Sequence, residues 1–264
     1  MEFFKYQGTG NDFVMIDDRV RPGRNKSFPA GNQELIRQIC HRRFGIGADG
    51  LILLQNDDDY DFRMVYFNAD GAEGSMCGNG GRCIVRFAHD LGLFTDKTRF
   101  RAVDGEHLAE VHGDEIFLKM SDVSGIEDRS GMSFLHTGSP HVVRFVTDLD
   151  DTDAVNVVAD GRKVRHDDRF SPGGTNVNFV QILDGNTLYV RTYERGVEDE
   201  TYSCGTGVTA VALVAYQQEG IHSPTVIKTL GGNLRVSFNP LPNGAFDNIY
   251  LIGPARQVFA GEML

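Results

Sequence analysis

Short apolar segments separated by glycine-rich turns make up much of this chain of 264 residues. Short apolar runs are typical of β-strands, whereas apolar positions spaced three and four apart are typical of helices. In the first half these patterns predict strands at 13–16, 51–54, 62–67, on both sides of Asp104-Gly105 and at 116–118. They predict helices at 33–43 and about 81–90, each with one apolar face. The polar segment 19–30 predicts an exposed loop.

The second half follows the same order. It predicts strands at 141–146, 179–183, 188–193, around Gly231-Gly232 and at 249–252. Segment 208–215 is apolar on nearly all sides, which predicts a helix buried inside its domain. Few helices and many short strands indicate an α+β fold, in which each half is a curved, mostly antiparallel sheet wrapped on a central helix.

The two halves also match residue by residue. One spacing separates Cys77 from Cys204, Tyr66 from Tyr193 and Gly105 from Gly232, and segment 4–10 matches 134–140 at nearly that spacing. Matched blocks in chain order argue for two copies of one fold. We therefore expect two pseudo-symmetric domains, 1–121 and 122–253, with the polar stretch 121–133 as the connection. Segment 254–264 has no counterpart, so we expect it to pack on the first domain.

Two cysteines stand in like surroundings, in Cys77-Gly78-Asn79-Gly80 and Cys204-Gly205-Thr206-Gly207, each before a helix-compatible run. Backbone amides at a helix start favour negative charge and lower the pKa of a thiol. A duplicated thiolate site suggests one cysteine on each side of a substrate. Such a pair suits proton transfer at carbon, in which a thiolate removes a proton from one face and a thiol delivers one to the other.

Composition narrows the alternatives. The formal net charge of −11 disfavours nonspecific nucleic-acid binding. The start has no signal-peptide core and no apolar run approaches a membrane span, so we expect a cytoplasmic protein without membrane contact. The four cysteines lack Cys-x-x-Cys spacing, which disfavours a disulfide scaffold or a zinc site. Cys40 and Cys83 lie on apolar helix faces and are expected to be structural.

Other polar residues lie near the cysteine segments. Asn11, Asn68 and Asn176 sit in turns or beside strands, where asparagine usually serves backbone geometry. The pair Glu194-Arg195 is either a surface ion pair or a holder of an amino group and a carboxylate. His141 is either structural or an orienting residue near the chemistry.

Five motifs cover both halves in order and are Gly8-Thr9-Gly10-Asn11-Asp12-Phe13-Val14, Asn68-Ala69-Asp70-Gly71, Cys77-Gly78-Asn79-Gly80-Gly81-Arg82-Cys83, Tyr193-Glu194-Arg195-Gly196 and Cys204-Gly205-Thr206-Gly207. Taken together, these motifs resemble the diaminopimelate epimerase family. The resemblance implies a cofactor-independent, metal-free epimerase that interconverts LL- and meso-diaminopimelate for lysine and peptidoglycan-precursor synthesis. It also implies two pseudo-symmetric domains with the active site in the cleft between them. A homodimer is the candidate assembly.

The resemblance assigns roles by motif. Cys204 would accept the proton and Cys77 donate it in the LL to meso direction. The residues implied to bind the reacting carboxylate through the helix starts are Gly78, Asn79, Gly205 and Thr206. Those implied to bind the rest of the substrate are Asn11, Asn68, Asn176, Glu194 and Arg195. His141 and Glu194 would be supporting groups.

Three departures from the family pattern concern the pocket. Ser139 stands where members often have asparagine, and Gly50 stands where some have glutamine. The segment 196–203 is one residue longer than the commoner spacing. Fine positioning of the substrate is therefore the part of the resemblance that these residues affect.

Other functions compete with this one. A related two-thiol racemase of the proline or hydroxyproline type would share the chemistry. A thiol hydrolase needs only one covalent cysteine and a base, which leaves the second matching cysteine unexplained. Pyridoxal phosphate is disfavoured because no lysine stands in a comparable motif. A non-catalytic amino-acid-binding protein of the same fold would leave both thiols unreactive.

Overall fold

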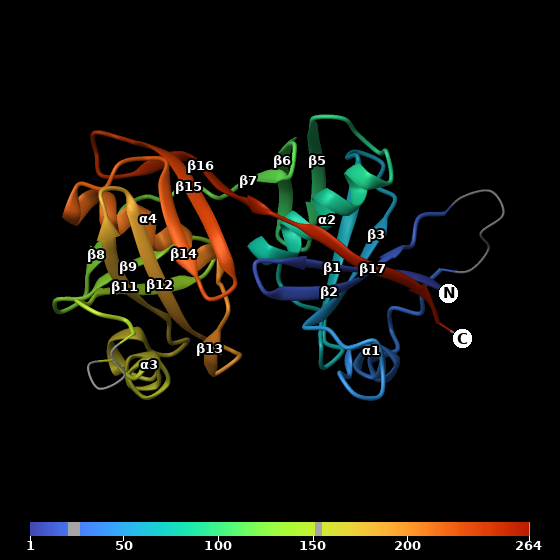
Figure 1. The fold of residues 1–264 in the computed structure, drawn as a ribbon, viewed down its shortest axis with the longest axis horizontal. Helices are drawn as coiled ribbons and strands as arrows, with labels where there is room; N and C mark the ends of the chain where they lie inside the picture. Colours follow the sequence, from blue (N-terminus) through green and yellow to red (C-terminus); the bar gives the residue numbers. More distant parts are fainter. Residues whose placement is uncertain (21–26, 151–154, 264) are drawn as a thin grey trace. The chain divides into compact units, whose positions relative to one another are not determined.

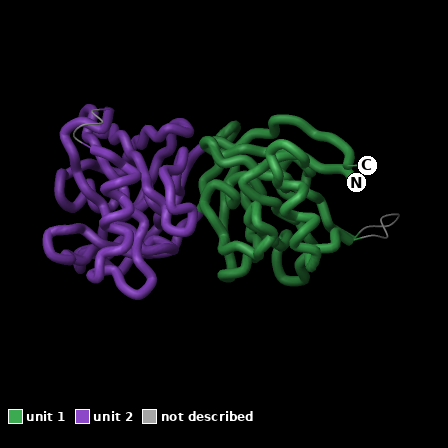
Figure 2. Tube along the Cα trace, turned by 90° about the horizontal axis from the view of Figure 1, so that it is seen from below, with its two compact units in different colours: residues 1–118, 254–264 green, residues 119–253 purple. Residues whose placement is uncertain are grey.

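The structure is a computed structural model that describes residues 1–20, 27–150 and 155–263. The loop expected at 19–30 lies partly outside the described residues. The chain divides into two compact units (Figure 2). Unit 1 comprises Met1–Leu118 and Pro254–Leu264, and unit 2 comprises Lys119–Gly253. The C-terminal segment is thus separated in sequence from the rest of its unit.

The sheet of unit 1 follows the chain from strand to strand. Its strands are β1 (Glu2–Gly8), β2 (Asn11–Asp17), β3 (Gly50–Gln55), β4 (Phe62–Asn68), β5 (Lys97–Ala102), β6 (Gly105–His112), β7 (Glu115–Lys119) and β17 (Arg256–Glu262). Pairing is antiparallel for β1–β2, β3–β4, β5–β6 and β6–β7 and parallel for β2–β3 and β4–β5. β17 adds to the free edge of β1 in antiparallel register.

Unit 2 repeats this order of pairings. Its strands are β8 (Glu127–Asp128), β9 (Ser133–His136), β10 (Pro140–Phe145), β11 (Asn176–Asp184), β12 (Thr187–Glu194), β13 (Asp199–Thr201), β14 (Thr225–Thr229), β15 (Gly232–Pro240) and β16 (Phe246–Pro254). Pairing is antiparallel for β9–β10, β11–β12, β12–β13, β14–β15 and β15–β16 and parallel for β10–β11 and β12–β14. β8 pairs with β9 as β17 pairs with β1, so the repeat includes the added strand.

One helix lies at the centre of each unit. The helices are α1 (Gln33–Cys40), α2 (Gly78–Asp90), α3 (Val157–Arg165), α4 (Gly205–Glu219) and a 3-10 turn at Asp168–Phe170. α2 packs on β1, β2, β3, β6 and β17, and α4 packs on β9, β10, β11, β14 and β15 (Figure 1). Because strands from distant parts of each sheet contact one helix, the sheet curves around it. The predicted α+β fold with two repeated domains is confirmed.

Burial explains the apolar segments that stood out in the sequence. β3 lies between α1 and α2, so Leu51 to Leu54 are all fully buried and give a continuous apolar run. The α4 residues from Val208 to Ala215 have no exposed surface, which confirms the helix predicted to be buried on nearly all sides.

Two helices differ from the predictions. α1 ends at Cys40 instead of Arg43, because His41 turns to extended backbone and its ring Nδ1 accepts the N–H groups of Arg43 and Phe44 at 3.1 Å. α3 was not predicted at all, since Gly161 interrupts a polar segment. A Cβ at Gly161 would lie 2.4 Å from Cβ of Tyr193, so glycine permits this helix to pack on β12.

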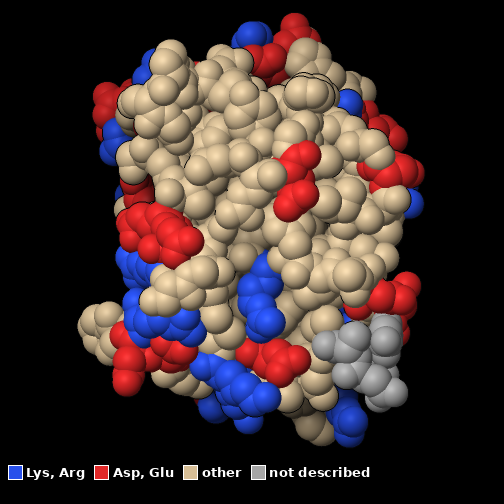
Figure 3. Space-filling view, turned by 90° about the vertical axis from the view of Figure 1, so that its left-hand side faces the viewer, with Lys and Arg blue, Asp and Glu red and all other residues tan. Residues whose placement is uncertain are grey.

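β1 was also not predicted as a strand, because its charged Lys5 interrupts the apolar run. In the structure Lys5 is 5% exposed and forms an ion pair with Asp12 at 2.8 Å, which removes the cost of burying an unpaired ammonium group. No helix in the described ranges is long and apolar enough to span a membrane. On the face shown in Figure 3, Lys and Arg side chains lie among Asp and Glu.

Candidate active site

Cys77 is the N-cap residue of α2. Its backbone is extended (φ −117°, ψ 147°), and its Sγ accepts the N–H of Gly80 at 3.2 Å. A Cβ at Gly80 would lie 3.1 Å from this sulfur, so glycine lets the first helical turn close on the thiol. The helix therefore begins at Gly78, earlier than the predicted start at about Gly81. Cys77 is half-buried and lies at the positive end of the helix.

Cys204 is the N-cap residue of α4 and has similar backbone angles (φ −120°, ψ 113°). Its side chain makes no cap hydrogen bond, and its Sγ lies 3.4 Å from the Thr206 hydroxyl instead. Cys204 is 8% exposed, so its side chain is largely buried. A Cβ at Gly207 would lie 3.4 Å from the sulfur and 2.5 Å from Oδ1 of Asn178. Both cysteines stand at helix starts, as predicted.

In unit 1 the side chain of Asn79 joins two polar partners. Its Nδ2 donates to Oδ1 of Asn11 at 2.7 Å, and its Oδ1 accepts from Nη2 of Arg82 at 3.0 Å. The same Arg82 nitrogen donates to the Thr9 hydroxyl at 2.8 Å, and Nη1 donates to the Gly78 carbonyl at 3.3 Å. Asn11, Gly78 and Asn79, three predicted substrate-binding residues, are thus close together at the start of α2.

Arg82 brings a positive charge into this group. It is fully buried, and burial lowers its pKa to about 10, so the guanidinium remains protonated at neutral pH. A negative charge on Cys77 and the positive charge of Arg82 stabilise each other, since the cysteine acts to raise the Arg82 pKa. The sequence analysis did not select Arg82 as a functional candidate, although it belongs to the motif that follows Cys77.

In unit 2 the counterpart of Asn79 is Thr206, and it contacts a histidine. His141 is fully buried, and its Nε2 lies 2.9 Å from the hydroxyls of Ser139 and Thr206. Its Nδ1 lies 3.1 Å from Nδ2 of Asn178. Burial, followed by the positive charges of His136 and Arg195, lowers the His141 pKa to about 3, so the ring is neutral at pH 7.

The tautomer of His141 follows from its neighbours. Asn178 accepts the Thr192 hydroxyl on Oδ1 at 3.0 Å and donates from Nδ2 to the Val142 carbonyl at 2.9 Å. Nδ2 of Asn178 therefore faces Nδ1 of His141, which must accept. The ring proton is then on Nε2 and is donated toward Ser139 and Thr206. The Thr206 hydroxyl, in turn, is left to donate toward Ser139 or the sulfur of Cys204.

The remaining candidates of unit 2 lie around the end of β12. Asn176 is 3% exposed, and its Nδ2 donates to Ser139 Oγ at 3.2 Å and to the Pro140 carbonyl at 2.8 Å. Its Oδ1 accepts the backbone N–H of Arg195 at 2.8 Å. Glu194 accepts the Thr201 hydroxyl at 3.0 Å. Asn176 thus joins the His141 segment to the Glu194-Arg195 segment.

The structure shows what surrounds the departures at residues 50 and 139. A Cβ at Gly50 would lie 2.5 Å from Cε2 of Tyr66, so the tyrosine ring fills the space beside this glycine. Ser139 belongs to the hydrogen-bond network of this site, because its hydroxyl lies 3.1 Å from that of Thr206. Asn68, at the end of β4, is exposed, with Nδ2 3.1 Å from the position of a Gly74 Cβ.

The other two cysteines are structural, as predicted. Burial raises the pKa of Cys40 to about 11 and raises that of Cys83 further, so both thiols stay protonated. Within the described parts of the chain, no three His, Cys, Asp or Glu side chains gather as metal ligands would.

The fold is shared with solved structures of low sequence identity. The PhzF-family phenazine biosynthesis protein of Bacillus anthracis matches with a TM-score of 0.79 at 14% identity, over 100% of this chain and 99% of the other. A hydroxyproline epimerase of Agrobacterium vitis matches with a TM-score of 0.65 at 14% identity, over 99% and 91%. The protein is therefore a two-domain α+β protein of the fold these structures share.

Sequence comparison defines the family within this fold. The family model described as diaminopimelate epimerase matches residues 3–124 and 133–258. Relatives named diaminopimelate epimerase include one from Flavobacterium psychrophilum, 48% identical over 98% of both chains, and one from Chlorobaculum tepidum, 45% identical over 97% of this chain and 98% of the other. The chain belongs to the diaminopimelate epimerase family, and it is an isomerase of the epimerase type.

Proposed function

We propose that the protein interconverts LL- and meso-diaminopimelate by proton transfer between two cysteines. The observation that carries this proposal is the equivalence of Cys77 and Cys204. Each is the N-cap residue of the central helix of its unit. That helix follows β4 in unit 1 and, after the short strand β13, the corresponding strand β12 in unit 2. The substrate is inferred from the relatives, which are named diaminopimelate epimerase.

The proposed reaction balances without an added reagent. In the LL to meso direction the Cys204 thiolate takes the α-proton and becomes a thiol, leaving an enolate-like carbanion. The Cys77 thiol then gives its proton to the opposite face of the carbon and becomes a thiolate. Amide groups at the starts of α2 and α4 stabilise negative charge of this kind. No cofactor takes part in either step.

The other motif residues complete the proposed site. Gly78, Asn79, Gly205 and Thr206 supply the helix-start groups for the reacting carboxylate. Asn11, Asn68, Asn176, Glu194 and Arg195 are proposed to bind the rest of the substrate. The side-chain NH₂ of Asn176 donates to Ser139 and Pro140, so its proposed contribution is to hold the Arg195 backbone and to offer the remaining acceptor capacity of its oxygen. His141 and Glu194 are proposed as supporting groups.

A deuterium experiment tests the reaction. LL-diaminopimelate is incubated with the protein in D₂O, and the α-proton and the meso product are followed by NMR. We expect deuterium at the α-carbon of the meso product, because the donor thiol exchanges with solvent. No exchange together with no meso product would exclude the proposal.

Two controls address the competing functions. A panel containing proline and hydroxyproline tests the related racemases, and we expect no turnover of these cyclic substrates. A non-catalytic binding protein would leave both thiols unreactive. We therefore expect rapid alkylation of Cys77 or Cys204 by iodoacetamide, suppressed by diaminopimelate.

The cellular setting is proposed from the family resemblance. It comprises a role in lysine and peptidoglycan-precursor synthesis, a cytoplasmic location and a homodimer. Light scattering on the purified protein measures the mass in solution. A mass of twice 29.2 kDa is the expected result.

A further inference from the structure

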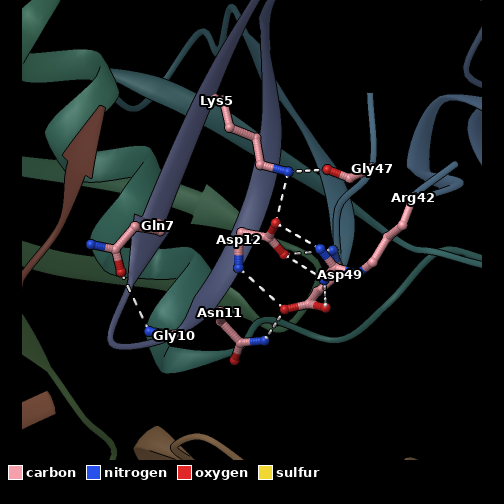
Figure 4. Close-up of polar contacts among 8 residues, drawn as sticks. All are labelled: Lys5, Gln7, Gly10, Asn11, Asp12, Arg42, Gly47 and Asp49. Carbon is pink, nitrogen blue, oxygen red and sulfur yellow. Dashed lines mark hydrogen bonds and ion pairs between the residues drawn. The ribbon is translucent and has the colours of Figure 1, made fainter. Parts of the chain in front are cut away.

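Behind the start of α2, two carboxylates and two cations form one cluster in unit 1 (Figure 4). Asp12 on β2 pairs with Lys5 at 2.8 Å and with Arg42 at 2.8 Å, and Arg42 also pairs with Asp49 at 2.5 Å. The Lys5 ammonium donates to the Gly47 carbonyl as well. Burial alone would raise the Asp12 pKa, but hydrogen bonds from Arg42 and Lys5 outweigh it and hold the pKa at about 2.

Asp49 connects this cluster to the proposed site. Its Oδ1 accepts from Arg42, while its Oδ2 accepts from Nδ2 of Asn11 at 2.8 Å and from the backbone N–H of Asp12 at 3.2 Å. Both carboxylate oxygens therefore face donors. The donors on both sides are satisfied only by a side chain that accepts hydrogen bonds on both of its terminal atoms, and an ionised carboxylate is such a group.

The hydrogen bonds that lead from Asp49 to α2 all have a defined donor and acceptor. Because Asp49 can only accept, Asn11 must turn its NH₂ toward it and its oxygen toward Asn79. Asn79 donates its NH₂ to that oxygen at 2.7 Å. At the other end Arg82 can only donate, so it faces the oxygen of Asn79. The charged groups at the two ends of this series of hydrogen bonds, Asp49 and Arg82, therefore require the same orientation of the Asn11 and Asn79 amides.

We propose that Asp49, anchored by Arg42, is a positioning residue that fixes the direction of the Asn11 amide, and with it the Asn79 amide, for binding of the amino-acid substrate. This inference rests on the proposed function, since Asn11 and Asn79 are assigned to substrate binding there. Once its NH₂ is held by Asp49, half-buried Asn11 keeps a second N–H and a second acceptor lone pair in a defined direction. A fixed donor of this kind suits a carboxylate oxygen of the substrate.

The replacement Asp49→Asn tests this chemistry with little change of shape. Whichever way the new amide turns, its NH₂ meets a donor, either Arg42 or Asn11 with the Asp12 N–H. The oxygen of the new amide should accept from the charged Arg42, so the Asn11 NH₂ loses its acceptor. We expect KM for LL-diaminopimelate to rise about 10-fold, while kcat changes less than about 3-fold, as for loss of one hydrogen bond to a charged group.

Glu34→Gln is the matched control. Glu34 is also a carboxylate paired with an arginine, Arg37, but it lies on the exposed side of α1 and makes no contact with Asn11. We expect wild-type KM and kcat for it. Asp12→Asn is the structural comparison, because Asp12 shares Arg42 and Lys5 but does not bond to the Asn11 side chain. It should lower the thermal midpoint more than Asp49→Asn does.

A double-mutant cycle separates positioning from general destabilisation. If Asp49 acts through Asn11, Asp49→Asn should change KM less than about 2-fold when Asn11 is already alanine. Equal 10-fold effects in both backgrounds would overturn the proposal, as would an unchanged KM in Asp49→Asn itself.

An NMR measurement keeps the test independent of the reaction. In spectra of side-chain amides, the Asn11 NH₂ signals should shift and broaden in Asp49→Asn but not in Glu34→Gln. If the wild type does not turn over LL-diaminopimelate, the proposed function fails while this readout still tests the orientation. Unchanged Asn11 signals in Asp49→Asn would overturn the positioning role.

Discussion

The two cysteine segments share a backbone and differ in what surrounds the sulfur. At Cys77 a backbone N–H of Gly80 reaches the thiol, whereas at Cys204 the nearby donor is the hydroxyl of Thr206. Two residues after each cysteine, Asn79 is held by a buried, charged Arg82, and Thr206 by a buried, neutral His141. The repeat thus preserves helix-start geometry while the electrostatics diverge.

This difference matters for a two-base reaction. Identical surroundings would give two thiols with the same preference for charge, although the reaction needs one thiolate and one thiol. A fixed positive charge beside one cysteine and a neutral hydrogen-bond network beside the other make the two sites distinguishable before substrate binds.

The largest effect is expected on removing either thiol. Cys77→Ala and Cys204→Ala should each lower kcat/KM for epimerisation by about 10²- to 10⁴-fold or more, because each removes one proton carrier. The comparison becomes sharper with deuterium exchange. Cys77→Ala should still exchange the α-proton of the LL substrate without inversion, and Cys204→Ala should do so only with the meso substrate. Retention of normal turnover in either variant would contradict the two-cysteine mechanism.

The next effect concerns stability in mild acid. His141 has a pKa of about 3 when folded and an ordinary value near 6.5 when unfolded. Its contribution to stability is therefore complete above about pH 6.5 and is lost as the pH falls toward 3. The free energy of unfolding should fall by up to about 1.4 kcal/mol per pH unit, and by about 2 kcal/mol between pH 6.5 and 4.5.

The buried charged groups Arg82 and Asp12 of unit 1 do not titrate in that range. Arg82 stays charged, with a pKa of about 10, and Asp12, with a pKa of about 2, loses its contribution only as the pH falls from about 4 toward 2. Urea unfolding followed by circular dichroism suits this chain, which has no Trp. His141→Gln should remove the slope between pH 6.5 and 4.5. An unchanged slope in that variant would assign it to other groups.

A smaller difference is expected between the glycines that face the two sulfurs. A Cβ at Gly207 would meet Oδ1 of Asn178 at 2.5 Å, and Asn178 holds the His141 ring, so Gly207→Ala should destabilise by about 2 kcal/mol. A Cβ at Gly80 would meet the sulfur of Cys77 and the ends of Ile52 and Met64 at 3.1–3.5 Å. Those side chains can shift, and alanine favours the helix by about 1 kcal/mol, so Gly80→Ala should be close to neutral. Equal costs in urea unfolding would refute this contrast.

The sequence could predict what repeats and what is periodic. The apolar runs of β3 and α4 and the duplicated Cys-Gly-x-Gly predicted a repeated α+β fold with a thiol at each helix start. The helix α3 was not predicted, because its polar residues and Gly161 form no clear apolar face. The glycine is explained by close packing on Tyr193, which the sequence does not reveal.

The partners of the site were harder to predict. The sequence analysis did not select three of these partners, Arg82, Asn178 and Asp49. Each either lies far in sequence from the residue that it positions or has the pattern of an ordinary helix, strand or loop residue. The burial of a charged side chain would have indicated a functional partner, but the sequence does not show which charged side chains are buried. Arg82 is an arginine within an otherwise buried helical segment, which requires hydrogen-bond partners that no periodicity reveals.

The smallest effect isolates the hydroxyl that distinguishes Cys204 from Cys77. Because His141 donates toward Thr206, the Thr206 hydroxyl is free to donate to the sulfur, and a bond of this kind stabilises a thiolate. Thr206→Val keeps the shape and removes the donor, so kcat/KM should fall about 10-fold. Thr206→Ser, which keeps the hydroxyl, should stay within about 3-fold of wild type.

Alkylation by iodoacetamide locates this effect, because mass spectrometry reports each cysteine separately. In Thr206→Val the rate at Cys204 should fall at neutral pH, while the rate at Cys77 serves as the internal control and stays unchanged. Similar rates at Cys204 in wild type and Thr206→Val would mean that the hydroxyl does not support the thiolate. Cys204 would then depend on its helix start alone, and the two sulfurs would differ less than their surroundings do.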